Sequence, residues 1–397
     1  MSRFLFVVPP FVGHLNPLLA VAAELTARGH QVAWAGNEPW LRSRIRSGAR
    51  VYDVITADFV RRADDRPAEL RGAAALKYLW QDYLVPLAEA TTGAVGRAVA
   101  EFRPDVLVAD QQAFAGALVA ERTGIPLATT ASTSAEIVSP LAPKVAEWVR
   151  GLLHGLRARF GDPAATTDLR FAGDPVLVFT TRALTGPVDT TGRPIHFVGP
   201  AIGGRPAAEW SWPWGTSDAA VLVTLGTANI DVGEPFLARA AEFFAGRPDL
   251  PAIIVDPAGD LGPQPDTIAV VPNVPVLSVL PRCAAVVCHA GQNTVCEALW
   301  HGVPLVVAPI RDDQQLIAGQ VVAAGAGVRI RFGRSDATRI GQAVDTVLGD
   351  QGFRTAATAV GDSFRAAGGV TAAAERLHRL ALGTGGHRIE ESARPAG

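Results

Sequence analysis

The stretch HAGQNTVCEALWHGVPLVVAPIRDDQQ, residues 289–315, carries the strongest prediction of the fold. It directly follows the apolar run 284–288, which predicts a buried strand, and it continues into a predicted helix over 294–300. Gly291 lies in the short loop between them, where a glycine allows close backbone approach. A helix N-terminus carries unpaired N–H groups and partial positive charge, so this unit predicts a phosphate site near Asn293 and Thr294.

Polar side chains at set positions extend this prediction from a phosphate to a sugar. Glu297 follows Asn293 by one helical turn on the same face, where a carboxylate accepts from two adjacent sugar hydroxyls. Asp313 and Gln314 follow the predicted strand 304–308 and suit the hydroxyls of a hexose. Each feature has a plain structural alternative: a satisfied histidine at 289, a solvated glutamate, or a helix N-cap at the Asp-Asp-Gln run. Their ordered combination favours the ligand site.

Alternating apolar strands and amphipathic helices extend outward from this segment. The predicted strands are 4–8, 31–35, 105–109, 126–130, 219–225, 252–255, 284–288 and 304–308, and the predicted helices are 17–28, 114–123, 235–244, 294–300 and 318–324. Such alternation predicts α/β architecture, with parallel sheets covered by helices on both faces. Because the pattern restarts near residue 219, we predict two Rossmann-like doubly wound domains that enclose an interdomain cleft. The expected bounds are 1–200, a linker at 201–217, 218–382, and a mobile tail at 383–397.

Composition excludes several classes of protein. The chain has 397 residues, a net charge of −2 and 48% hydrophobic residues, which argue against a nucleic-acid partner and against disorder. The first apolar run is shorter than a signal peptide requires, and no run reaches the ~18 residues of a membrane span. The three cysteines cluster between residues 283 and 296, which argues against a disulfide framework. Cys283 and Cys288 lie in an apolar strand run, which predicts small buried side chains. A cytoplasmic protein is expected.

The segment 289–314 closely resembles the donor-binding signature of the family-1 glycosyltransferases, which include plant secondary-product and bacterial antibiotic glycosyltransferases. That signature reads H-x-G-x-N-[ST]-x-x-E, then G-V-P, then P-x-x-x-[DE]-Q. The matching residues are His289, Gly291, Asn293, Thr294, Glu297, Gly302, Val303, Pro304, Pro309, Asp313 and Gln314. The resemblance implies the GT-B fold, with His289, Asn293 and Thr294 on the diphosphate of a nucleotide sugar. It also implies that Glu297 holds the ribose and that Asp313 and Gln314 hold the sugar.

Two further donor-side segments are similar to the family less closely. The plant signature has a tryptophan after the glycine, and this chain has Gln292 at that position. The family segment that stacks on the nucleobase is only loosely matched by Val271-Pro272-Asn273-Val274. The resemblance assigns contacts to the nucleobase of the donor to Asn273 and Val274. The loop Thr224-Leu225-Gly226-Thr227 resembles the family's small-residue loop facing the diphosphate, with an ordinary tight turn as the alternative.

A candidate base and its partner lie in the first half of the chain. His14 follows the first predicted strand in PPFVGHLNP, with Pro17 expected in the first turn of the next helix. The pKa of an unperturbed histidine, about 6.5, suits it to remove a proton from an alcohol near neutral pH. Asp110 ends another predicted strand and could orient the second ring nitrogen. Helix capping is the alternative for both residues, but both match the family's base histidine and its aspartate.

This pair predicts an inverting transfer by one displacement, with the leaving diphosphate stabilised by His289 and the helix N-terminus. No D-x-D triplet occurs, which agrees with a site that needs no metal or other cofactor. Glu297 favours a UDP-sugar over a dTDP-sugar, because a ribose offers two adjacent hydroxyls. A dTDP-deoxysugar transferase of antibiotic biosynthesis is the alternative.

The acceptor is expected on the N-terminal domain, within residues 70–92 and 133–160. The candidate acceptor-binding residues are Tyr78, Trp80, Tyr83, Ile137 and Trp148. Their apolar character suits a lipophilic natural product, and ordinary amphipathic helix packing is the alternative. The expected partners are therefore a small-molecule aglycone and a nucleotide sugar. Assembly into a homodimer is left as an alternative.

Three other classes of function compete with the transferase. A nucleotide-sugar epimerase or hydrolase would share the phosphate contacts, and a non-catalytic subunit would share the fold. The intact set of His14, Asp110, Glu297, Asp313 and Gln314 argues against the non-catalytic subunit. A nicotinamide oxidoreductase is disfavoured, because no G-x-G-x-x-G follows the first strand.

Overall fold

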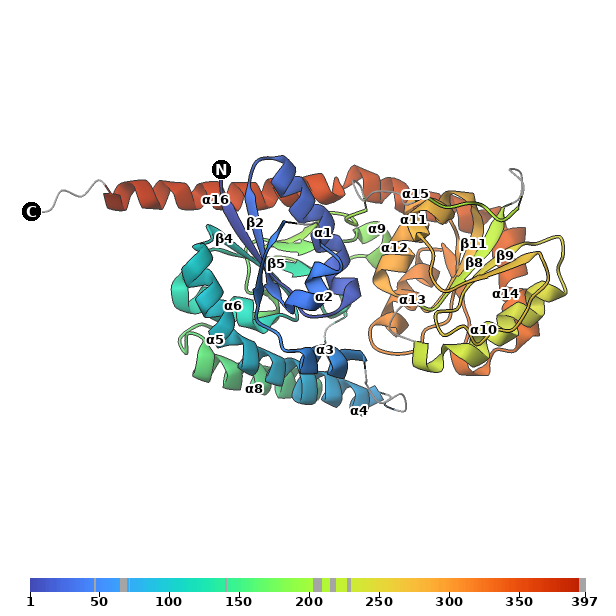
Figure 1. Ribbon diagram of the computed structural model, residues 1–397, viewed down its shortest axis with the longest axis horizontal. Coiled ribbons are helices and arrows are strands. Elements are labelled where there is room, and N and C mark those ends of the chain that lie inside the picture. The colour runs from blue at the N-terminus through green and yellow to red at the C-terminus, as the bar shows by residue number, and fades with distance from the viewer. Residues whose placement is uncertain are drawn as a thin grey trace, which may run out of the picture. The chain divides into compact units, whose positions relative to one another are not determined.

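The computed structural model describes residues 1–45, 48–64, 70, 72–139, 141–202, 209–214, 219–226 and 230–392 (Figure 1). The chain divides into two compact units. Unit 1 comprises Met1–Phe179, Asp189–Gly204 and Ala367–Gly397, and unit 2 comprises Thr180–Val188 and Arg205–Ala366. None of the described helices is long and apolar enough to cross a membrane.

Unit 1 is built on a parallel sheet with the strand order β3-β2-β1-β4-β5-β6-β7. Its strands are β1 (Arg3–Val7), β2 (Gln31–Gly36), β3 (Arg50–Asp53), β4 (Val106–Asp110), β5 (Leu127–Ala131), β6 (Val176–Val178) and β7 (Ile195–Phe197). Its helices are α1 (Val12–Ala27), α2 (Glu38–Arg42), α3 (Ala57–Asp64), α4 (Gly72–Lys77), the π-helix η1 (Tyr78–Leu84), α5 (Val85–Phe102), α6 (Phe114–Thr123), α7 (Ala135–Val138), α8 (Pro143–Phe160), the 3-10 helix η2 (Leu169–Phe171) and α16 (Gly369–Ser392).

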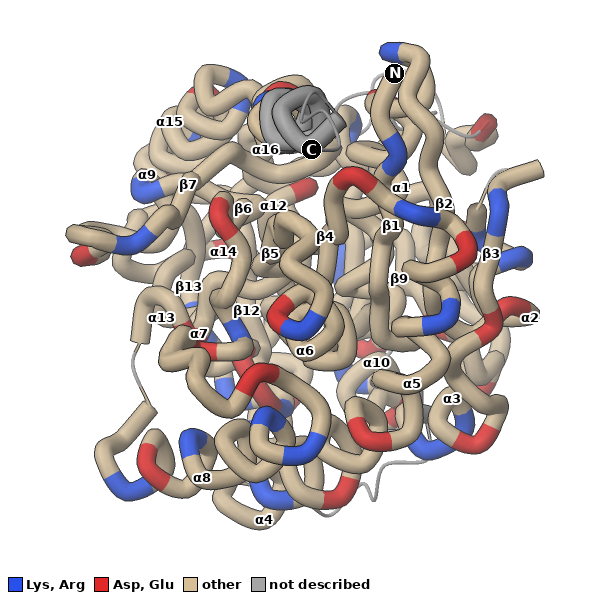
Figure 2. The backbone as a smooth tube through the Cα atoms, turned by 90° about the vertical axis from the view of Figure 1, so that its left-hand side faces the viewer, with Lys and Arg blue, Asp and Glu red and all other residues tan. Residues whose placement is uncertain are grey.

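Side chains along β1 alternate between the two faces of this sheet, which explains why helices cover both faces. Leu5 and Val7 point into a core shared with α5, α6 and α8, whereas Phe4 and Phe6 point into a core shared with α1 and α16. These strand residues are almost fully buried, as the near-continuous apolar run predicts for a parallel sheet. Charged positions gather on the helices and connecting segments, and the strands are almost free of them (Figure 2).

Unit 2 repeats this architecture with the parallel order β10-β9-β8-β11-β12-β13. Its strands are β8 (Ala220–Thr224), β9 (Ala252–Val255), β10 (Ile268–Val271), β11 (Cys283–Cys288), β12 (Leu305–Val307) and β13 (Gly327–Arg329). Its helices are α9 (Arg182–Thr185), α10 (Ile230–Ala245), α11 (Val276–Val279), the 3-10 helix η3 (Leu280–Arg282), α12 (Gln292–Trp300), α13 (Gln314–Ala323), the 3-10 helix η4 (Phe332–Arg334), α14 (Ala337–Gly349) and α15 (Gln351–Ala366). The three cysteines are free, as expected, and all are buried.

The two units divide the chain differently from the expected domain bounds at both ends of unit 2. Residues 367–382 were expected in the C-terminal domain, but α16 packs in unit 1. The reason is its apolar stripe, including Val370, Ala374 and Leu377, which completes the core beside α1. Residues 180–188, with α9, belong to unit 2 instead of the N-terminal domain. Of the expected tail, α16 extends to Ser392 and residues 393–397 lie outside the described part, as does most of the expected linker.

Candidate active site

His14 lies in the first turn of α1, immediately after the first strand of unit 1. The helix begins at Val12, with extended Phe11 as its N-cap, so it starts earlier than the sequence suggested and Pro17 lies inside it. The Phe11 carbonyl accepts hydrogen bonds from the backbone N–H groups of His14 and Leu15. This tight entry places the imidazole at the carboxyl edge of the sheet, where ligands bind in doubly wound folds.

His14 and Asp110 form the expected pair. Asp110 is the last residue of β4, which pairs in register with β1 through Val7 and Ala109, so the two side chains emerge at the same edge. His14 Nδ1 lies 2.9 Å from Asp110 Oδ1, and the side chains are 17% and 0% exposed. A carboxylate only accepts hydrogen bonds, so we assign the proton to Nδ1. The tautomer leaves the lone pair of Nε2 to act as a base.

Two groups that the sequence did not single out also contact Asp110. The backbone N–H of Gln112 donates to Oδ1 over 2.9 Å, and the hydroxyl of Ser132 donates to Oδ2. Ser132 directly follows β5, the strand beside β4. The signal available in the sequence was a hydroxyl residue just past a predicted strand end, but the neighbouring strand could be identified only from the sheet order.

An imidazole held between two glycines marks the donor segment of unit 2. A Cβ added at Gly291 would lie 2.3 Å from His289 Nε2, and one added at Gly226 would lie 2.6 Å from His289 Cε1. Ala290, between His289 and Gly291, adopts a φ of +66°, a left-handed conformation that alanine rarely occupies. Such strained positions cluster at functional sites. Both glycines are therefore needed to seat the ring, which adds to the close approach expected at Gly291.

His289 is a neutral, buried group at the start of a helix. Burial lowers the pKa of His289 to about 4; hydrogen bonding to the Thr224 backbone opposes this change, and the charge of Arg311 adds to it. The side chain is 7% exposed, and its Nδ1 has no hydrogen-bond partner among the described residues. A buried ring nitrogen without a partner is costly unless a ligand satisfies it. The helix α12 begins here, with Gly291 as its N-cap and Gln292 as its first residue.

The first two turns of α12 carry the remaining candidates from the first part of the signature. Asn293 and Thr294 are half-buried at the N-terminal end, and Glu297 is 6% exposed. Burial of Glu297 disagrees with the alternative of a solvated helix face. Gln292, where plant relatives carry tryptophan, turns inward and its amide donates to Cys296 Sγ over 3.1 Å.

The turn before α13 presents Asp313 and Gln314. Asp313 occupies the N-cap position, but its side chain makes no capping hydrogen bond, which argues against the plain N-cap alternative. Gln314 is 6% exposed, and its Oε1 accepts from the backbone N–H groups of Ile310 and Arg311 over 2.9 and 3.0 Å. Gln314 therefore shapes this turn with its oxygen and can serve a ligand through its amide nitrogen. Asp312, with a φ of +52°, is another strained residue in this turn.

The other donor-side candidates lie at the carboxyl ends of neighbouring strands in the same sheet. Thr224 ends β8, and its hydroxyl accepts from the backbone N–H of Gly226 over 3.3 Å. Asn273 and Val274 follow β10, which is separated from β11 by β9 and β8. Thr227 lies outside the described residues. The candidate donor residues of unit 2 that the structure describes thus share one edge of its sheet.

Three of the five candidate acceptor residues are core residues. Trp80, Tyr83 and Ile137 are only 2%, 2% and 3% exposed, which fits the alternative of helix packing and leaves them little surface for an acceptor. Tyr78 and Trp148 are half-buried. The sequence could not separate the two uses, because an apolar side chain on an amphipathic helix has the same spacing whether it faces a core or a pocket.

Phe11 is an aromatic residue beside the base that the sequence did not single out. Its ring centroid lies 5.4 Å from that of His14 and 5.4 Å from that of Tyr83. Phe11 is half-buried, whereas Tyr83 lies behind it in the π-helix η1, and its hydroxyl donates to the Phe59 carbonyl. π-helical turns are rare and often mark functional sites. An apolar aromatic surface therefore borders the imidazole.

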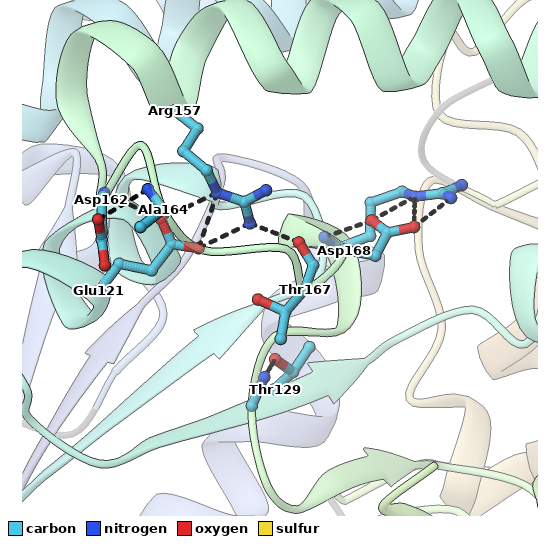
Figure 3. Close-up of polar contacts among 9 residues, drawn as sticks. Glu121, Thr129, Arg157, Asp162, Ala164, Thr167 and Asp168 are labelled. Carbon is cyan, nitrogen blue, oxygen red and sulfur yellow. Dashed lines mark hydrogen bonds and ion pairs between the residues drawn. The ribbon is translucent and has the colours of Figure 1, made fainter. Parts of the chain in front are cut away.

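Helix α8, which carries Trp148, is fixed at its C-terminal end by a buried ion pair (Figure 3). Arg157 donates to Glu121 of α6 over 2.7 Å and to the Thr167 carbonyl, and the Arg157 and Glu121 side chains are 8% and 9% exposed. The backbone N–H of Asp162 also donates to Glu121. This network anchors the helix and the loop that follows it to the body of unit 1.

Comparisons with known proteins agree with the fold. Residues 251–380 match the family described as erythromycin biosynthesis protein CIII-like, C-terminal domain. Demethyllactenocin mycarosyltransferase of Streptomyces fradiae is 31% identical over 96% of this chain and 87% of its own length. The 4'-demethylrebeccamycin synthase of Lentzea aerocolonigenes is 29% identical over 96% of this chain and 99% of its own. The solved glycotransferase of kitacinnamycin is 28% identical, with a TM-score of 0.79 over 96% of this chain and 99% of that one. The chain therefore belongs to the GT-B glycosyltransferases of the family-1 type found in antibiotic biosynthesis.

Proposed function

We propose that this glycosyltransferase is inverting and moves a hexose from a UDP-sugar to a hydroxyl of a lipophilic natural product. The observation that carries the proposal is the bond of 2.9 Å between His14 Nδ1 and the fully buried Asp110 carboxylate. It supports a base whose Nε2 lone pair is fixed in place, with a carboxylate that stabilises the imidazolium formed during the reaction. The aromatic surface at Phe11 supports a lipophilic acceptor.

In the proposed step, the acceptor oxygen forms a bond to the anomeric carbon while the bond from that carbon to the diphosphate breaks. The hydroxyl proton passes to His14 Nε2. A single displacement of this kind inverts the configuration of the anomeric carbon. The leaving nucleoside diphosphate takes the electron pair of the broken bond.

The donor contacts proposed for unit 2 follow the order of its strands. The diphosphate is assigned to the N-terminal N–H groups of α12, to Asn293 and Thr294, and to the neutral ring of His289, with Thr224 and Gly226 beside it. Glu297 is assigned to the ribose. Asp313 and the amide nitrogen of Gln314 are assigned to the sugar. The N–H and hydroxyl groups assigned to the diphosphate offset its leaving charge without a metal ion.

We assign the nucleoside contacts to residues further along the same edge. Asn273 and Val274 follow β10, three strand spacings from β11, which is roughly 14 Å. Their position on the same sheet edge as the proposed phosphate site supports a nucleobase site at these two residues.

A dTDP-deoxysugar is the second candidate donor, because the name of one relative includes a TDP-linked sugar. The TDP-daunosamine transferase of Streptomyces peucetius, 27% identical over 94% of this chain, carries TDP in its name. Glu297 favours UDP instead, since a buried carboxylate with one hydroxyl fewer to accept from loses about 1–3 kcal/mol. UDP-glucose and dTDP-glucose carry the same sugar, so a comparison of their kcat/KM values isolates the nucleoside.

A panel of UDP- and dTDP-sugars against phenolic and polyketide aglycones, with products detected by mass spectrometry, tests the proposed reaction. The anomeric configuration of the product, read by NMR, must be opposite to that of the donor. Retention would overturn the single displacement. Each donor is also incubated without acceptor, and rapid conversion to free sugar or an epimer would favour a hydrolase or epimerase.

A further inference from the structure

The carboxylate of Asp110 is held at both oxygens. Oδ1 accepts from His14 Nδ1–H and from the backbone N–H of Gln112, each over 2.9 Å. Oδ2 accepts from the Ser132 hydroxyl. The Asp110 side chain is 0% exposed, so bulk solvent does not reach these oxygens. Ser132 therefore holds the one carboxylate oxygen that neither His14 nor the Gln112 backbone contacts.

We propose that Ser132 is a positioning residue for the base, acting on His14 through Asp110. This inference rests on the proposed function, in which His14 removes the acceptor proton. A bond from a fixed hydroxyl to Oδ2 opposes rotation of the carboxylate about its Cβ–Cγ bond. The orientation of Oδ1 toward His14 then keeps the ring proton on Nδ1 and the lone pair on Nε2.

The backbone places the hydroxyl where this role requires it. Asp110 pairs with Thr130 in the register of β4 and β5, and the Gln111 N–H donates to the Thr130 carbonyl over 2.9 Å. Ser132 follows two residues later and is 5% exposed. Its position is therefore set by the pairing of two central strands, which makes its hydroxyl a rigid donor.

A substitution at Ser132 separates positioning from simple packing. In Ser132→Ala, Oδ2 is left buried without a donor, and the carboxylate is free to turn away from His14. We expect the Nδ1–H tautomer of His14 to lose its dominance while the fold persists. Thr130→Val is the matched control, since it removes a buried hydroxyl from the same strand region that donates to the Ala109 carbonyl and not to Asp110.

The primary measurement is a long-range 1H–15N spectrum of the ligand-free full-length protein labelled at histidine, with His14 assigned through the signals lost in His14→Gln. In Ser132→Ala the shifts of the two ring nitrogens of His14 should move toward each other. In Ser132→Thr, which keeps the hydroxyl, and in Thr130→Val, they should match the parent. Unchanged His14 shifts in Ser132→Ala would overturn the proposal, even if the melting temperature falls.

Kinetics with the donor and aglycone pair found in the panel give a second readout. Ser132→Ala should lower kcat by roughly tenfold to hundredfold with both KM values unchanged, the size expected for a misplaced catalytic group. Ser132→Thr should restore kcat. If Ser132→Ala does not fold, Ser132→Cys keeps the volume with a much weaker donor and is judged by the same criteria. Full transfer by His14→Gln would refute the proposed base, whereas the nitrogen shifts would still report whether Ser132 positions His14.

Discussion

Gly291→Ala would displace the His289 ring without straining the backbone at the substituted residue. Gly291 has φ −67° and ψ 138°, which alanine adopts freely. The added Cβ would lie 2.3 Å from Nε2 and 2.9 Å from Cε1 of His289, far inside ordinary contact distance. The ring must therefore move by roughly 1 Å, because carbon atoms pack at about 3.5–4.0 Å.

The expected loss of nucleotide affinity follows from the proposed hydrogen bond between the His289 ring and the charged diphosphate. A hydrogen bond to a charged group contributes about 1.5–3 kcal/mol, so its loss should weaken nucleotide binding by roughly tenfold to 150-fold. Crowding in the core should also lower the free energy of unfolding by about 1–3 kcal/mol. Gly319→Ala is the control, because a Cβ there meets nothing within 4 Å.

Isothermal titration with UDP and with dTDP measures the first effect, and thermal unfolding measures the second. Gly291→Ala should bind the nucleotide as weakly as His289→Ala does, and the double variant should be no weaker than either single variant. Gly319→Ala should keep the parent Kd. Parent-like binding by Gly291→Ala would refute the argument that this glycine exists to seat the imidazole.

Four other outcomes are expected. His289 stays neutral in the folded protein down to a pKa of about 4 but protonates near 6.5 when unfolded, so full stability holds above pH 6.5 and falls below it. Urea unfolding at pH 7 and pH 5 should show a loss of about 2 kcal/mol from this group, absent in His289→Gln. Glu297→Gln should reduce any preference for UDP-glucose over dTDP-glucose in kcat/KM. EDTA should leave the initial rate of transfer unchanged, and a rate restored by Mg²⁺ would contradict the metal-free proposal. The three cysteines, buried with thiol pKa values raised to about 12, should react with a thiol reagent only on unfolding.

The parts of the site that were predictable are those that local sequence determines. A strand, a loop glycine and a helix within 284–300 place a helix N-terminus at the sheet edge, whatever the rest of the chain does. His14 and Asp110 could be paired because His14 follows one predicted strand, Asp110 follows another, and parallel strands share a carboxyl edge. The expectation needed only the direction of the strands.

The parts that were missed depend on which elements become neighbours. Ser132 could not be assigned to Asp110 without knowing that β5 lies beside β4. The burial of Trp80 and Tyr83 could not be separated from pocket lining, because both uses give the same helical spacing. The apolar stripe of α16 does not identify from sequence alone the unit that it completes, and its packing beside α1 shows that it belongs to unit 1.

The position of α16 has a consequence for how the chain folds during synthesis. Unit 1 is translated first, yet its core beside α1 is completed by residues that follow the whole of unit 2. At roughly 5–20 residues per second, the ribosome needs about 10–30 s to pass from residue 204 to 367. During that interval α16, the helix that packs on the apolar stripe of α1, has not yet been synthesised. All strands of unit 2 are therefore synthesised before the last helix of unit 1, and a premature stop near residue 366 would remove a helix from the core of the first-made unit.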